Sequence, residues 1–467
     1  MFIQQLYTNC LSEAAYYIES NGEAAILDPL RDIEPYLSLS KKRNTTIKYI
    51  FETHFHADFV SGHIDLAKVT GAPIIYGPGA KPSYHVHNAK DGERFILGKI
   101  SIEAIHTPGH TLESTCYLLR DENDKTHAIF TGDTLFVGDV GRPDLSSGNL
   151  GREELADILY NTIQQKILPL ADDIIVYPAH GPGSSCGKSL GPNTFSTIGQ
   201  EKQNNYALQP QDRNTFIKAV TDGLTDAPKY FSVNAHINQK GYSDLQDLKK
   251  QGLQALDINS FKKWVAEDAI ILDTRHATIF TQGFVPGSIS IGLEGRFAEW
   301  AGNILSFDKN IILVTEPGKE EESLIRLARV GFEKIQGYLQ GGFETYRNAG
   351  EKIDMIIDIE ADELAMDIPH DPQLLVVDVR REAEFNNGHI KNAMNLPLHL
   401  MIDPALLANF EDQQNLYIHC AGGYRSVTAA SLLKLQGINN IRNVLGGWDK
   451  IKLEDNIKQV KEAVMLN

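Results

Sequence analysis

The chain has 467 residues, which is too long for one ordinary hydrophobic core and suits two to four domains. Hydrophobic residues make up 42% and charged residues 22%, and the formal net charge of −17 disfavours nucleic acids and anionic membranes as partners. No apolar run approaches the ~18 residues of a membrane span, and the start lacks the pattern of a secretory signal. The four cysteines are too few and too scattered for a disulfide framework or a four-thiolate metal site. We therefore expect a cytoplasmic protein with reduced thiols.

Short apolar strands alternate with helices and loops over roughly the first 235 residues. The predicted strands, each ending at Asp, Gly, Pro or His, are 24–28, 47–51, 74–76, 100–105, 128–130 and 174–177. In α/β folds, polar residues at strand ends form the functional site, because the sheet aims the side chains of the following loop. A polar, turn-rich stretch from about 207 to 256 predicts the end of this domain and a linker.

An internal repeat organises the C-terminal half. Ile271–Arg275 recurs as Val376–Arg380, and Gly341–Phe343 recurs as Gly446–Trp448, both 105 residues later. A constant offset over several features predicts two copies of one α/β module of roughly 100 residues. We predict a first domain over residues 1–235, a linker over 236–255, a first copy over 256–350 and a second copy over 357–467.

Four motifs in the first domain place an imidazole or a carboxylate just after a predicted strand. They are THFHADF at 53–59, TPGHT at 107–111, TGDT at 131–134 and YPAHG at 177–181. A single histidine in such a position is usually structural, but four signals in this order are hard to explain that way. Because strand ends meet at one edge of a sheet, we expect the motifs to converge on a metal site.

This order of motifs resembles the metallo-β-lactamase fold, an αββα sandwich, over roughly residues 1–235. Two-metal members of that fold read H-x-H-x-D-H in the first motif, whereas here Phe59 holds the last position and cannot ligate a metal. The resemblance assigns a second metal to Asp58, Asp133, His180 and the missing histidine. Loss of a neutral nitrogen ligand should abolish or weaken that second site, which argues against a two-zinc hydrolase.

A single metal site then remains. The motif T-H-x-H-A-D and the stretch Gly132–Arg142 are similar to those of the persulfide dioxygenases, a mononuclear-iron branch of this fold. The resemblance implies one Fe(II) per chain, bound by His54, His110 and Asp133. Two imidazoles and one carboxylate suit iron(II) with open positions for substrate and O₂, although the same ligands also accept zinc.

The resemblance also implies roles for polar residues around the metal. His56, Asp58 and His180 would orient the ligands or order water. Arg142 would hold an anionic part of the substrate, because a guanidinium suits carboxylate and sulfonate groups, with a surface salt bridge as the alternative interpretation.

The loop at 181–189 looks like a phosphate-binding loop, but Pro182 stands where that motif needs glycine. We expect this loop to form a wall of the substrate pocket, where Cys186 and Lys188 could contact a thiol cofactor. Both residues also have a purely structural interpretation, and their roles stay open.

A second reactive position is Cys420, which stands between a predicted strand at 416–419 and an apolar helix at 427–435. Converging N–H groups and the positive end of a helix stabilise a thiolate there, and also an anion bound to it. The residues expected to surround the sulfur and bind substrate are Gly422, Gly423, Tyr424 and Arg425. A buried, inert cysteine would gain nothing from two glycines and an arginine, so we expect Cys420 and Arg425 to be catalytic.

The spacing within this loop separates two enzyme classes. Tyrosine-phosphatase-like loops have five residues between Cys and Arg, but only four separate Cys420 from Arg425. The shorter loop resembles that of rhodaneses, sulfurtransferases whose cysteine carries a persulfide sulfur. Asp378–Arg380 and Gly446–Trp448 also match the rhodanese pattern, and the likeness covers roughly residues 357–462.

The first copy of the module lacks this chemistry. Thr315 stands at the position of Cys420, and four glutamates lie in the loop 316–322 that follows it. A loop of this charge does not stabilise a thiolate or bind an anionic sulfur donor. We therefore interpret the first copy as a catalytically inactive rhodanese, a structural spacer or an interface.

The domain order is similar to that of bacterial persulfide dioxygenase–sulfurtransferase fusions of sulfide detoxification. The resemblance implies that a low-molecular-weight thiol persulfide and O₂ give sulfite and free thiol. It implies that Cys420 then passes sulfur to sulfite, giving thiosulfate, or works in reverse, and that fusion keeps the intermediate concentrated. We expect only small-molecule partners, no nucleic acid or membrane, and a homo-oligomer.

Two other functions remain open. A glyoxalase-II-like thioester hydrolase with an accessory rhodanese domain would need two metals, which Phe59 disfavours. A sulfur-carrier or sensing protein with a scaffold N-terminal domain would bind no metal, which the intact His54, His110 and Asp133 disfavour. The sequence does not identify the thiol that carries the persulfide.

Overall fold

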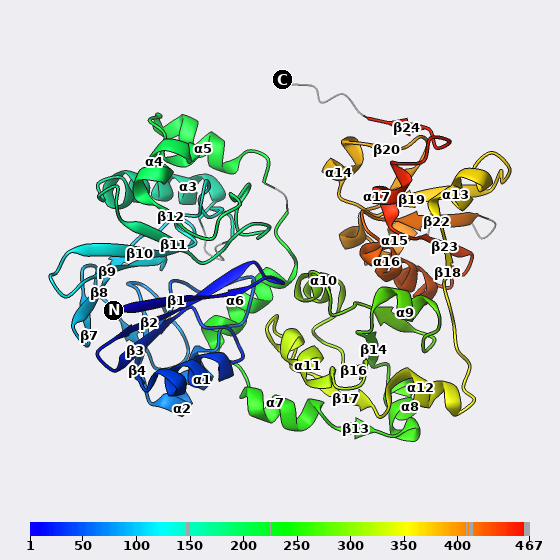
Figure 1. The fold of residues 1–467 in the computed structure, drawn as a ribbon, viewed down its shortest axis with the longest axis horizontal. Helices are drawn as coiled ribbons and strands as arrows, with labels where there is room; N and C mark the ends of the chain where they lie inside the picture. The colour runs from blue at the N-terminus through cyan, green and yellow to red at the C-terminus, as the bar shows by residue number, and fades with distance from the viewer. Residues whose placement is uncertain (146–149, 225, 408–409, 411–413, 462–467) are drawn as a thin grey trace. The chain divides into compact units, whose positions relative to one another are not determined.

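The structure, a computed structural model, describes residues 1–145, 150–224, 226–407, 410 and 414–461 (Figure 1). Contacts within the chain divide it into two units. The first comprises Met1–Asp247 and Ile325–Glu333, and the second comprises Leu248–Leu324 and Lys334–Asn467. The segment Ile325–Glu333 therefore packs with the first unit, although it lies within the first copy of the repeat.

Two six-stranded sheets form the centre of the first unit, with the orders β1-β2-β3-β4-β5-β6 and β12-β11-β10-β9-β8-β7. The first sheet contains β1 (Phe2–Thr8), β2 (Glu13–Ser20), β3 (Glu23–Leu27), β4 (Thr46–Phe51), β5 (Ile74–Tyr76) and β6 (His87–Asn88). The second contains β7 (Arg94–Leu97), β8 (Ile100–His106), β9 (Thr115–Arg120), β10 (Thr126–Gly132), β11 (Ile175–Pro178) and β12 (Ser196–Thr197). Every strand predicted from the sequence of this region is present.

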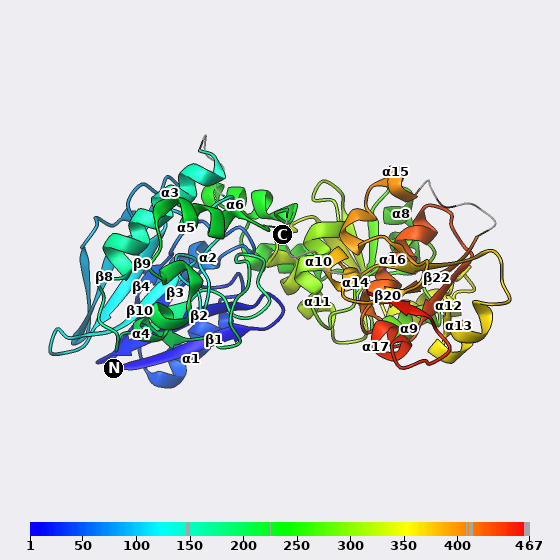
Figure 2. The ribbon, with the colours of Figure 1, turned by 90° about the horizontal axis from the view of Figure 1, so that it is seen from above.

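The two sheets pack face to face, and helices cover their outer faces (Figures 1 and 2). Aromatic rings fill the shared core, where Phe51 meets Tyr117 at a centroid distance of 4.8 Å and Tyr16 meets Phe130 at 4.9 Å. The helices of this unit are α1 (Glu34–Arg43), α2 (His63–Thr70), α3 (Arg152–Thr162), η1 (Ile163–Ile167), α4 (Ile198–Asn204), η2 (Tyr206–Leu208), α5 (Arg213–Thr221) and α6 (Tyr230–Lys240). Helices α1 and α2 pack on the first sheet, and α3, α4 and α5 pack on the second. This αββα sandwich confirms the predicted fold class.

The second unit contains two five-stranded sheets of identical strand order, β13-β17-β16-β14-β15 and β18-β23-β22-β19-β21. The first has β13 (Ala255–Leu256), β14 (Ile270–Asp273), β15 (Ser288–Ser290), β16 (Ile311–Val314) and β17 (Ile335–Leu339). The second has β18 (Ile357–Ile359), β19 (Leu374–Asp378), β21 (Met394–Asn395), β22 (Asn415–His419) and β23 (Ile441–Val444), and β20 (His389–Ile390) pairs with β24 (Gln459–Val460). The repeat seen in the sequence is thus a repeat of topology.

The helices beside these sheets also recur in order. In and before the first copy they are α7 (Leu245–Gly252), α8 (Ile258–Ala266), α9 (Ala277–Thr281), α10 (Phe297–Ile304), α11 (Glu320–Ala328) and α12 (Gly342–Asn348). In the second copy they are α13 (Ala361–Asp367), α14 (Glu382–Asn386), η3 (Leu398–Leu400), α15 (Pro404–Leu407), α16 (Tyr424–Leu435) and α17 (Gly447–Ile451). Two rhodanese-like α/β domains therefore follow the sandwich.

Helix α16 lies between the two copies. Its residues from Ser426 to Leu433 are all buried, and it contacts β22 and β23 of its own copy and β15 and α9 of the other. The N–H of Ser290 in the first copy donates to the hydroxyl of Ser431 at 3.1 Å. A helix buried on every face needs neighbours on every face, so the first copy completes the surroundings of α16.

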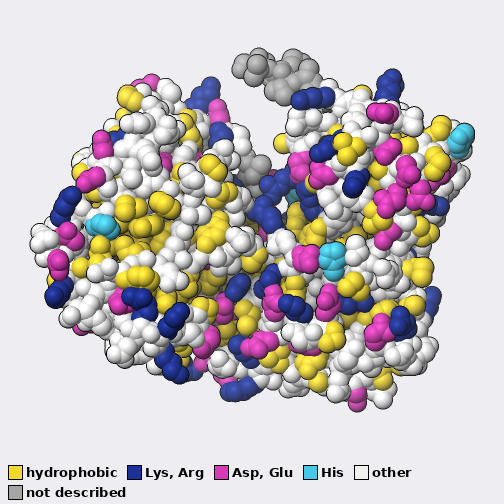
Figure 3. Space-filling view, in the orientation of Figure 1, with side chains coloured by type: hydrophobic (Ala, Val, Ile, Leu, Met, Phe, Trp, Pro, Cys, Tyr) yellow, Lys and Arg dark blue, Asp and Glu magenta, His cyan; other side chains and the backbone are white. Residues whose placement is uncertain are grey.

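Figure 3 shows acidic and basic side chains interspersed on the face that it draws. Among the described helices, none has the length and apolar character that crossing a membrane requires.

Candidate metal centre and reactive cysteine

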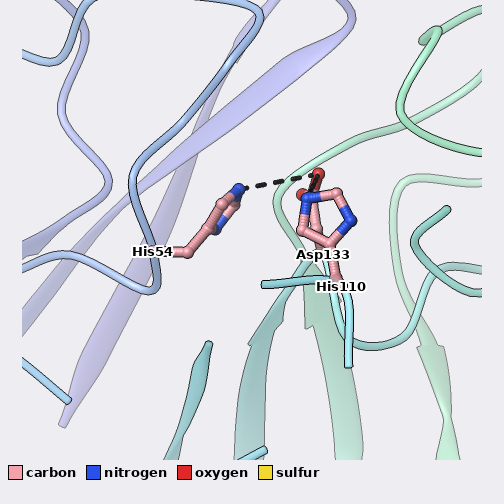
Figure 4. Close-up of side chains that lie close together, drawn as sticks. All are labelled: His54, His110 and Asp133. Carbon is pink, nitrogen blue, oxygen red and sulfur yellow. Dashed lines mark ion pairs between the residues drawn. The ribbon is translucent and has the colours of Figure 1, made fainter. Parts of the chain in front are cut away.

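Three loops of the first unit bring His54, His110 and Asp133 together (Figure 4). His54 follows β4, His110 lies between β8 and β9, and Asp133 follows β10, so each comes from the end of a strand. All three side chains are buried. Nε2 of His54 lies 3.8 Å and Nε2 of His110 lies 3.4 Å from Oδ2 of Asp133. The structure thus brings together the three residues that we predicted as ligands, within 4.8 Å of one another.

Hydrogen bonds decide which ring nitrogen of each histidine carries the hydrogen. Nδ1 of His110 lies 2.8 Å from the carbonyl oxygen of Arg142, and Nδ1 of His180 lies 3.1 Å from the carbonyl oxygen of Ser12. A carbonyl oxygen only accepts, so Nδ1 donates in both cases. In the neutral form of each ring the lone pair then lies on Nε2, which is the form that binds a metal.

His54 reaches the same state through Thr53. The hydroxyl of Thr53 donates to Oδ2 of Asp28 at 3.0 Å, so its oxygen can accept from Nδ1 of His54, also at 3.0 Å. The N–H of Thr53 donates to Oδ1 of the same Asp28 at 2.8 Å. Burial, together with the nearby His56, lowers the pKa of His54 well below its usual range. His54 is therefore a neutral imidazole with Nε2 directed at Asp133.

The polar atoms at this position fit a metal ion. Both carboxylate oxygens of Asp133, Nε2 of His180 and Oδ1 of Asp58 are buried and have no hydrogen-bond partner among the described residues. Buried polar atoms without partners cost free energy, and lone pairs that face one another repel. A cation between them removes both costs, so the donor set is that of a metal centre.

A second group of potential ligands adjoins the first. Ligand atoms of His56, Asp58 and His180 lie within 4.8 Å of one another. Nε2 of His180 is 3.4 Å from Oδ2 of Asp58 and 3.4 Å from Oδ1 of Asp133. Asp133 therefore lies between two positions that could hold a cation, one beside His54 and one beside His180.

His56 is part of a buried ion-pair network behind this loop. Its Nε2 lies 3.1 Å from Oδ1 of Asp28 and 3.7 Å from Oε2 of Glu52. Burial lowers the pKa of His56, but these two carboxylates outweigh it and raise the pKa to about 10. The ring of Phe59 packs against His56 with a centroid distance of 4.3 Å. A charged imidazole has no lone pair for a metal, so in this state His56 balances buried negative charge instead.

Arg142 is buried and already has an anionic partner. Its Nε and Nη2 each lie 2.7 Å from an oxygen of Asp144, and Nη1 donates to the carbonyl oxygen of Ser185 at 3.4 Å. Its own carbonyl oxygen holds His110, as described above. Binding of an anionic substrate by the Arg142 guanidinium stays a prediction, and it would require sharing that group with Asp144.

Cys186 and Lys188 lie in the loop predicted as a wall of the pocket. The sulfur of Cys186 belongs to a further group of potential ligands with Asp133 and His180. Burial raises the pKa of the Cys186 thiol well above its usual range. Nζ of Lys188 donates to the carbonyl oxygen of Ala219 at 3.3 Å. Contact of either residue with a thiol cofactor stays a prediction.

Sequence reasoning missed Asn238, which holds the metal-binding loop from helix α6. Its Nδ2 donates to the carbonyl oxygens of His56 and Phe59, both at 2.7 Å, and its Oδ1 accepts from the N–H of Ser61 at 2.9 Å. Asn238 lies in the polar stretch that we interpreted as a linker. Buried residues of α6 recur every four positions, and Asn at such a position was the available signal.

Cys420 lies where β22 ends, and α16 begins four residues later. Its side chain is buried, and the N–H of Gly423 donates to Sγ at 3.1 Å. Gly423 has φ +102°, a conformation that residues with a side chain rarely adopt. The hydroxyl of Ser426 lies 3.7 Å from Sγ. That hydroxyl accepts from the thiol and donates to the carbonyl oxygen of Gly423 at 3.1 Å, so the donor to the sulfur is the N–H of Gly423.

The residues that follow Cys420 have defined partners. Nη1 and Nη2 of Arg425 donate to the two carboxylate oxygens of Glu384 at 2.7 and 2.8 Å. The phenol of Tyr424 donates to the carbonyl oxygen of Gly292 in the first copy at 2.8 Å. Arg425 is therefore oriented within its own copy, whereas Tyr424 ties the loop to the other copy.

Gly447, the second glycine after β23, is needed because its backbone passes close to Cys420. The N–H of Trp448 donates to the carbonyl oxygen of Cys420 at 2.7 Å. A Cβ on Gly447 would lie 2.4 Å from that same oxygen, and Gly447 has φ +53°. The rhodanese signature Gly-Gly-Trp thus has a local steric cause.

The αββα sandwich carries histidines and carboxylates at its strand ends, where a metal can bind, and the duplicated α/β unit carries a cysteine loop in its second copy. Residues 8–180 match the metallo-beta-lactamase superfamily, and residues 257–349 and 360–454 match the rhodanese-like domain. The chain belongs to the metallo-beta-lactamase superfamily and carries two rhodanese-like domains after the metal-binding domain.

Known proteins similar to the chain include both structures and curated relatives. A metallo-beta-lactamase from Staphylococcus aureus subsp. aureus COL is 32% identical, with 73% of this chain and 99% of that chain covered and a TM-score of 0.66. A probable hydroxyacylglutathione hydrolase of Schizosaccharomyces pombe is 30% identical over 257 residues, which are 50% of this chain and 91% of the relative. ETHE1 from Myxococcus xanthus is 26% identical, and the match covers 51% of this chain and 98% of that chain with a TM-score of 0.45.

Proposed function

We propose that the chain is a bifunctional sulfur enzyme, an iron- and O₂-dependent persulfide dioxygenase joined to a thiosulfate sulfurtransferase. The first reaction converts a thiol persulfide, O₂ and water into the thiol, sulfite and two protons. The observation that carries the proposal is the pairing, in one chain, of the buried set His54, His110 and Asp133 with Cys420 in a rhodanese loop. Both chemistries act on the same kind of sulfur atom.

The metal domain would bind one Fe(II) through His54, His110 and Asp133, and iron(II) would supply the activation of O₂. Thr53 and the carbonyl oxygen of Arg142 orient the two imidazoles through Nδ1, so that Nε2 of each faces the metal position. Two neutral nitrogens and one carboxylate leave coordination positions for both O₂ and a thiolate sulfur. The missing fourth ligand at Phe59 favours a single ion.

The rhodanese domain would carry the transferable sulfur on Cys420. Sulfite attacks the outer sulfur of the Cys420 persulfide, a new S–S bond forms thiosulfate, and the bond to Sγ breaks. Cys420 leaves with the electron pair as a thiolate, which the N–H of Gly423 stabilises. The sulfane sulfur moves without a change in its oxidation state, so the step needs no oxidant.

A thioester hydrolase is the second candidate. Nε2 of His180 lies 3.4 Å from both Asp58 and Asp133, so a second cation could be held there even without a ligand at position 59. The Schizosaccharomyces pombe relative is named a hydroxyacylglutathione hydrolase. This function predicts two metal ions per chain and hydrolysis of a hydroxyacyl-glutathione thioester.

The proposal includes the domain boundaries, the cellular location and the partners expected from the sequence. The dioxygenase would occupy residues 1–235, a linker 236–255, the inactive rhodanese 256–350 and the active rhodanese 357–467. Free thiols at all four cysteines fit a reducing, cytoplasmic location. The partners would be small molecules, namely thiol persulfide, O₂, sulfite and thiosulfate, and the chain would form a homo-oligomer.

The test is O₂ consumption by anaerobically iron-loaded protein after addition of glutathione persulfide or coenzyme A persulfide. The proposal expects stoichiometric O₂ uptake with sulfite or thiosulfate as product. Cys420→Ser should abolish sulfur transfer and keep O₂ uptake, and Cys10→Ser should keep both. Loss of O₂ uptake in Cys420→Ser would show that the two sites are not independent. No uptake from protein with one iron per chain, together with thioester hydrolysis by protein with two metals, would favour the hydrolase.

A further inference from the structure

One segment of the first rhodanese copy packs with the metal-binding unit. Ile325–Glu333 includes the end of helix α11 and the turn before strand β17, yet its contacts assign it to the first unit. The rest of the first copy belongs to the second unit. The copy that lacks a reactive cysteine thus supplies a segment to the unit that holds the metal centre.

The backbone of this segment holds the end of the metal-binding loop, which begins at His54 and ends at Val60. The carbonyl oxygen of Arg329 accepts from the N–H of Val60 at 2.7 Å. Val60 is buried, so water does not replace this partner. The carbonyl oxygen of Phe59, the residue before it, accepts from Nδ2 of Asn238 at 2.7 Å. The end of the loop is therefore fixed from two sides, by helix α6 and by Arg329.

The side chain of Arg329 fixes where its carbonyl oxygen lies. Nε and Nη2 of Arg329 donate to the two carboxylate oxygens of Asp32 at 2.8 and 3.0 Å. The two side chains are 17% and 16% exposed, so the pair is shielded from most of the solvent. A guanidinium that binds a carboxylate through two parallel hydrogen bonds has one orientation, unlike an ammonium. Arg329 is thus held at a defined position beside the loop.

Asp32 belongs to a stretch of chain that is itself paired with the metal-binding loop. Leu30, two residues before Asp32, forms an antiparallel bridge with Ser61, the residue after Val60. Arg329 bonds to the loop side of this bridge through its carbonyl oxygen. It bonds to the other side through its guanidinium. One residue therefore joins both partners of the pairing that ends the loop.

The other end of the segment is anchored in the same unit. Oε1 and Oε2 of Glu333 accept from the N–H and the hydroxyl of Ser243, both at 3.0 Å. Nη2 of Arg31, whose side chain is fully buried, lies 3.6 Å from Oε1 of Glu333. A segment anchored at both ends is part of the metal-binding unit rather than a surface that lies against it.

We propose that Arg329 is a positioning residue of the metal centre, and that through it the first rhodanese copy sets how tightly the first domain holds its metal. Without the pair to Asp32, the carbonyl oxygen of Arg329 can move and the buried N–H of Val60 loses its partner. The loop then no longer holds His54 at a fixed distance from the other ligands. The inference rests on the metal centre of the proposed function and applies to either reaction considered for it.

The test uses full-length, metal-free protein with Co²⁺ as the probe. Competition with a chelator gives the affinity, and the visible absorption of bound Co²⁺ reports the geometry of its ligands. Absorption that Asp133→Ala removes identifies the ion at the metal centre. Arg329→Met should weaken Co²⁺ binding about three- to tenfold and change the absorption. Arg329→Lys keeps the charge without the two parallel hydrogen bonds, so it should recover only part of the affinity.

A double-variant cycle separates positioning from a general loss of stability. Asp32→Asn should also weaken Co²⁺ binding, and adding Arg329→Met should cause little further loss, because both changes remove one interaction. Lys434→Met is the matched control, since it removes an ion pair of 2.8 Å with Asp354 inside the second unit. Its effect should be confined to the free energy of unfolding, with the Co²⁺ affinity and absorption of the wild type.

The outcomes separate this inference from the proposed function. Wild-type Co²⁺ affinity and absorption in Arg329→Met would overturn the inference, and if that variant does not fold, the same result in Asp32→Asn would overturn it. Failure of the wild-type protein to bind Co²⁺ at the metal centre would overturn both the inference and the proposed function. Absence of O₂ uptake from iron-loaded wild type, with weakened Co²⁺ binding in Arg329→Met, would overturn the dioxygenase and support the inference.

Discussion

Nδ1 of His54 lies 3.0 Å from the hydroxyl oxygen of Thr53, and that hydroxyl is itself bonded to Asp28. Thr53→Val keeps the shape of the side chain and removes the hydrogen bond. The imidazole can then rotate or carry its hydrogen on Nε2, so we expect metal affinity to fall about tenfold or more. Competition with a chelator measures this affinity directly. Thr221→Val, on the surface helix α5, is the control, and equal affinities for the two variants would contradict the role of Thr53.

Asn238 and Asn234 allow a matched comparison on helix α6. Both are fully buried, but Asn238 bonds to the metal-binding loop, whereas the amide of Asn234 has no hydrogen-bond partner among the described residues. Asn238→Ala should lower the free energy of unfolding by about 1–3 kcal/mol and weaken metal binding, because two carbonyl oxygens lose their donor. Asn234→Ala should cost less and leave metal binding intact. Equal losses of metal in both variants would assign the effect to the helix as a whole.

Gly447 and Gly437 allow the energetic cost of a side chain at positive φ to be measured apart from the cost of a steric clash. Both have positive φ, but a Cβ on Gly447 would lie 2.4 Å from the carbonyl oxygen of Cys420, whereas nothing lies within 4 Å of a Cβ on Gly437. Gly437→Ala should cost about 1 kcal/mol of unfolding free energy. Gly447→Ala should cost about 2 kcal/mol more and abolish sulfur transfer. O₂ uptake should survive in both, and retained transfer in Gly447→Ala would contradict the steric explanation.

The ion pair between Glu384 and Arg425 should make stability depend on pH. Burial raises the pKa of Glu384, but the hydrogen-bonded Arg425 outweighs it and lowers the pKa below the ordinary value of 4.5. The pair therefore stabilises the folded state above about pH 4.5, and that stabilisation is lost as pH falls through the lower folded pKa. Denaturant unfolding of wild type and Glu384→Gln should differ by less than about 1 kcal/mol at pH 7, and the difference should shrink below pH 4.5. A difference that grows on acidification would contradict this sign, and Glu382→Gln is the control.

Much of the fold was visible in the sequence because strands, turns and repeats leave local patterns. The strands of the sandwich end at the histidine and aspartate motifs, and the constant offset of the repeat appears as two sheets of identical order. The meeting of His54 with His110 and Asp133 could also be anticipated, since each follows a strand. Strand and turn patterns depend on residues that are near one another in the sequence, so they can be recognised without the structure.

Contacts between distant segments were not predictable in the same way. Asn238 reaches a loop that lies about 180 residues earlier, and its own neighbourhood is polar. The contact of Nη1 of Arg142 with the carbonyl oxygen of Ser185 joins two loops that are 43 residues apart in the sequence. A cavity beside Gly423 is lined by residues of both copies, so it depends on how the two copies pack.

The enclosure of helix α16 by both copies sets a limit on how this chain can be shortened. Removing the first copy would open to water the side of α16 that β15 and α9 cover. Ser290, whose N–H donates to the hydroxyl of Ser431, would be lost with it. A piece of the chain that carries Cys420 alone would therefore lack part of the surroundings of its own helix.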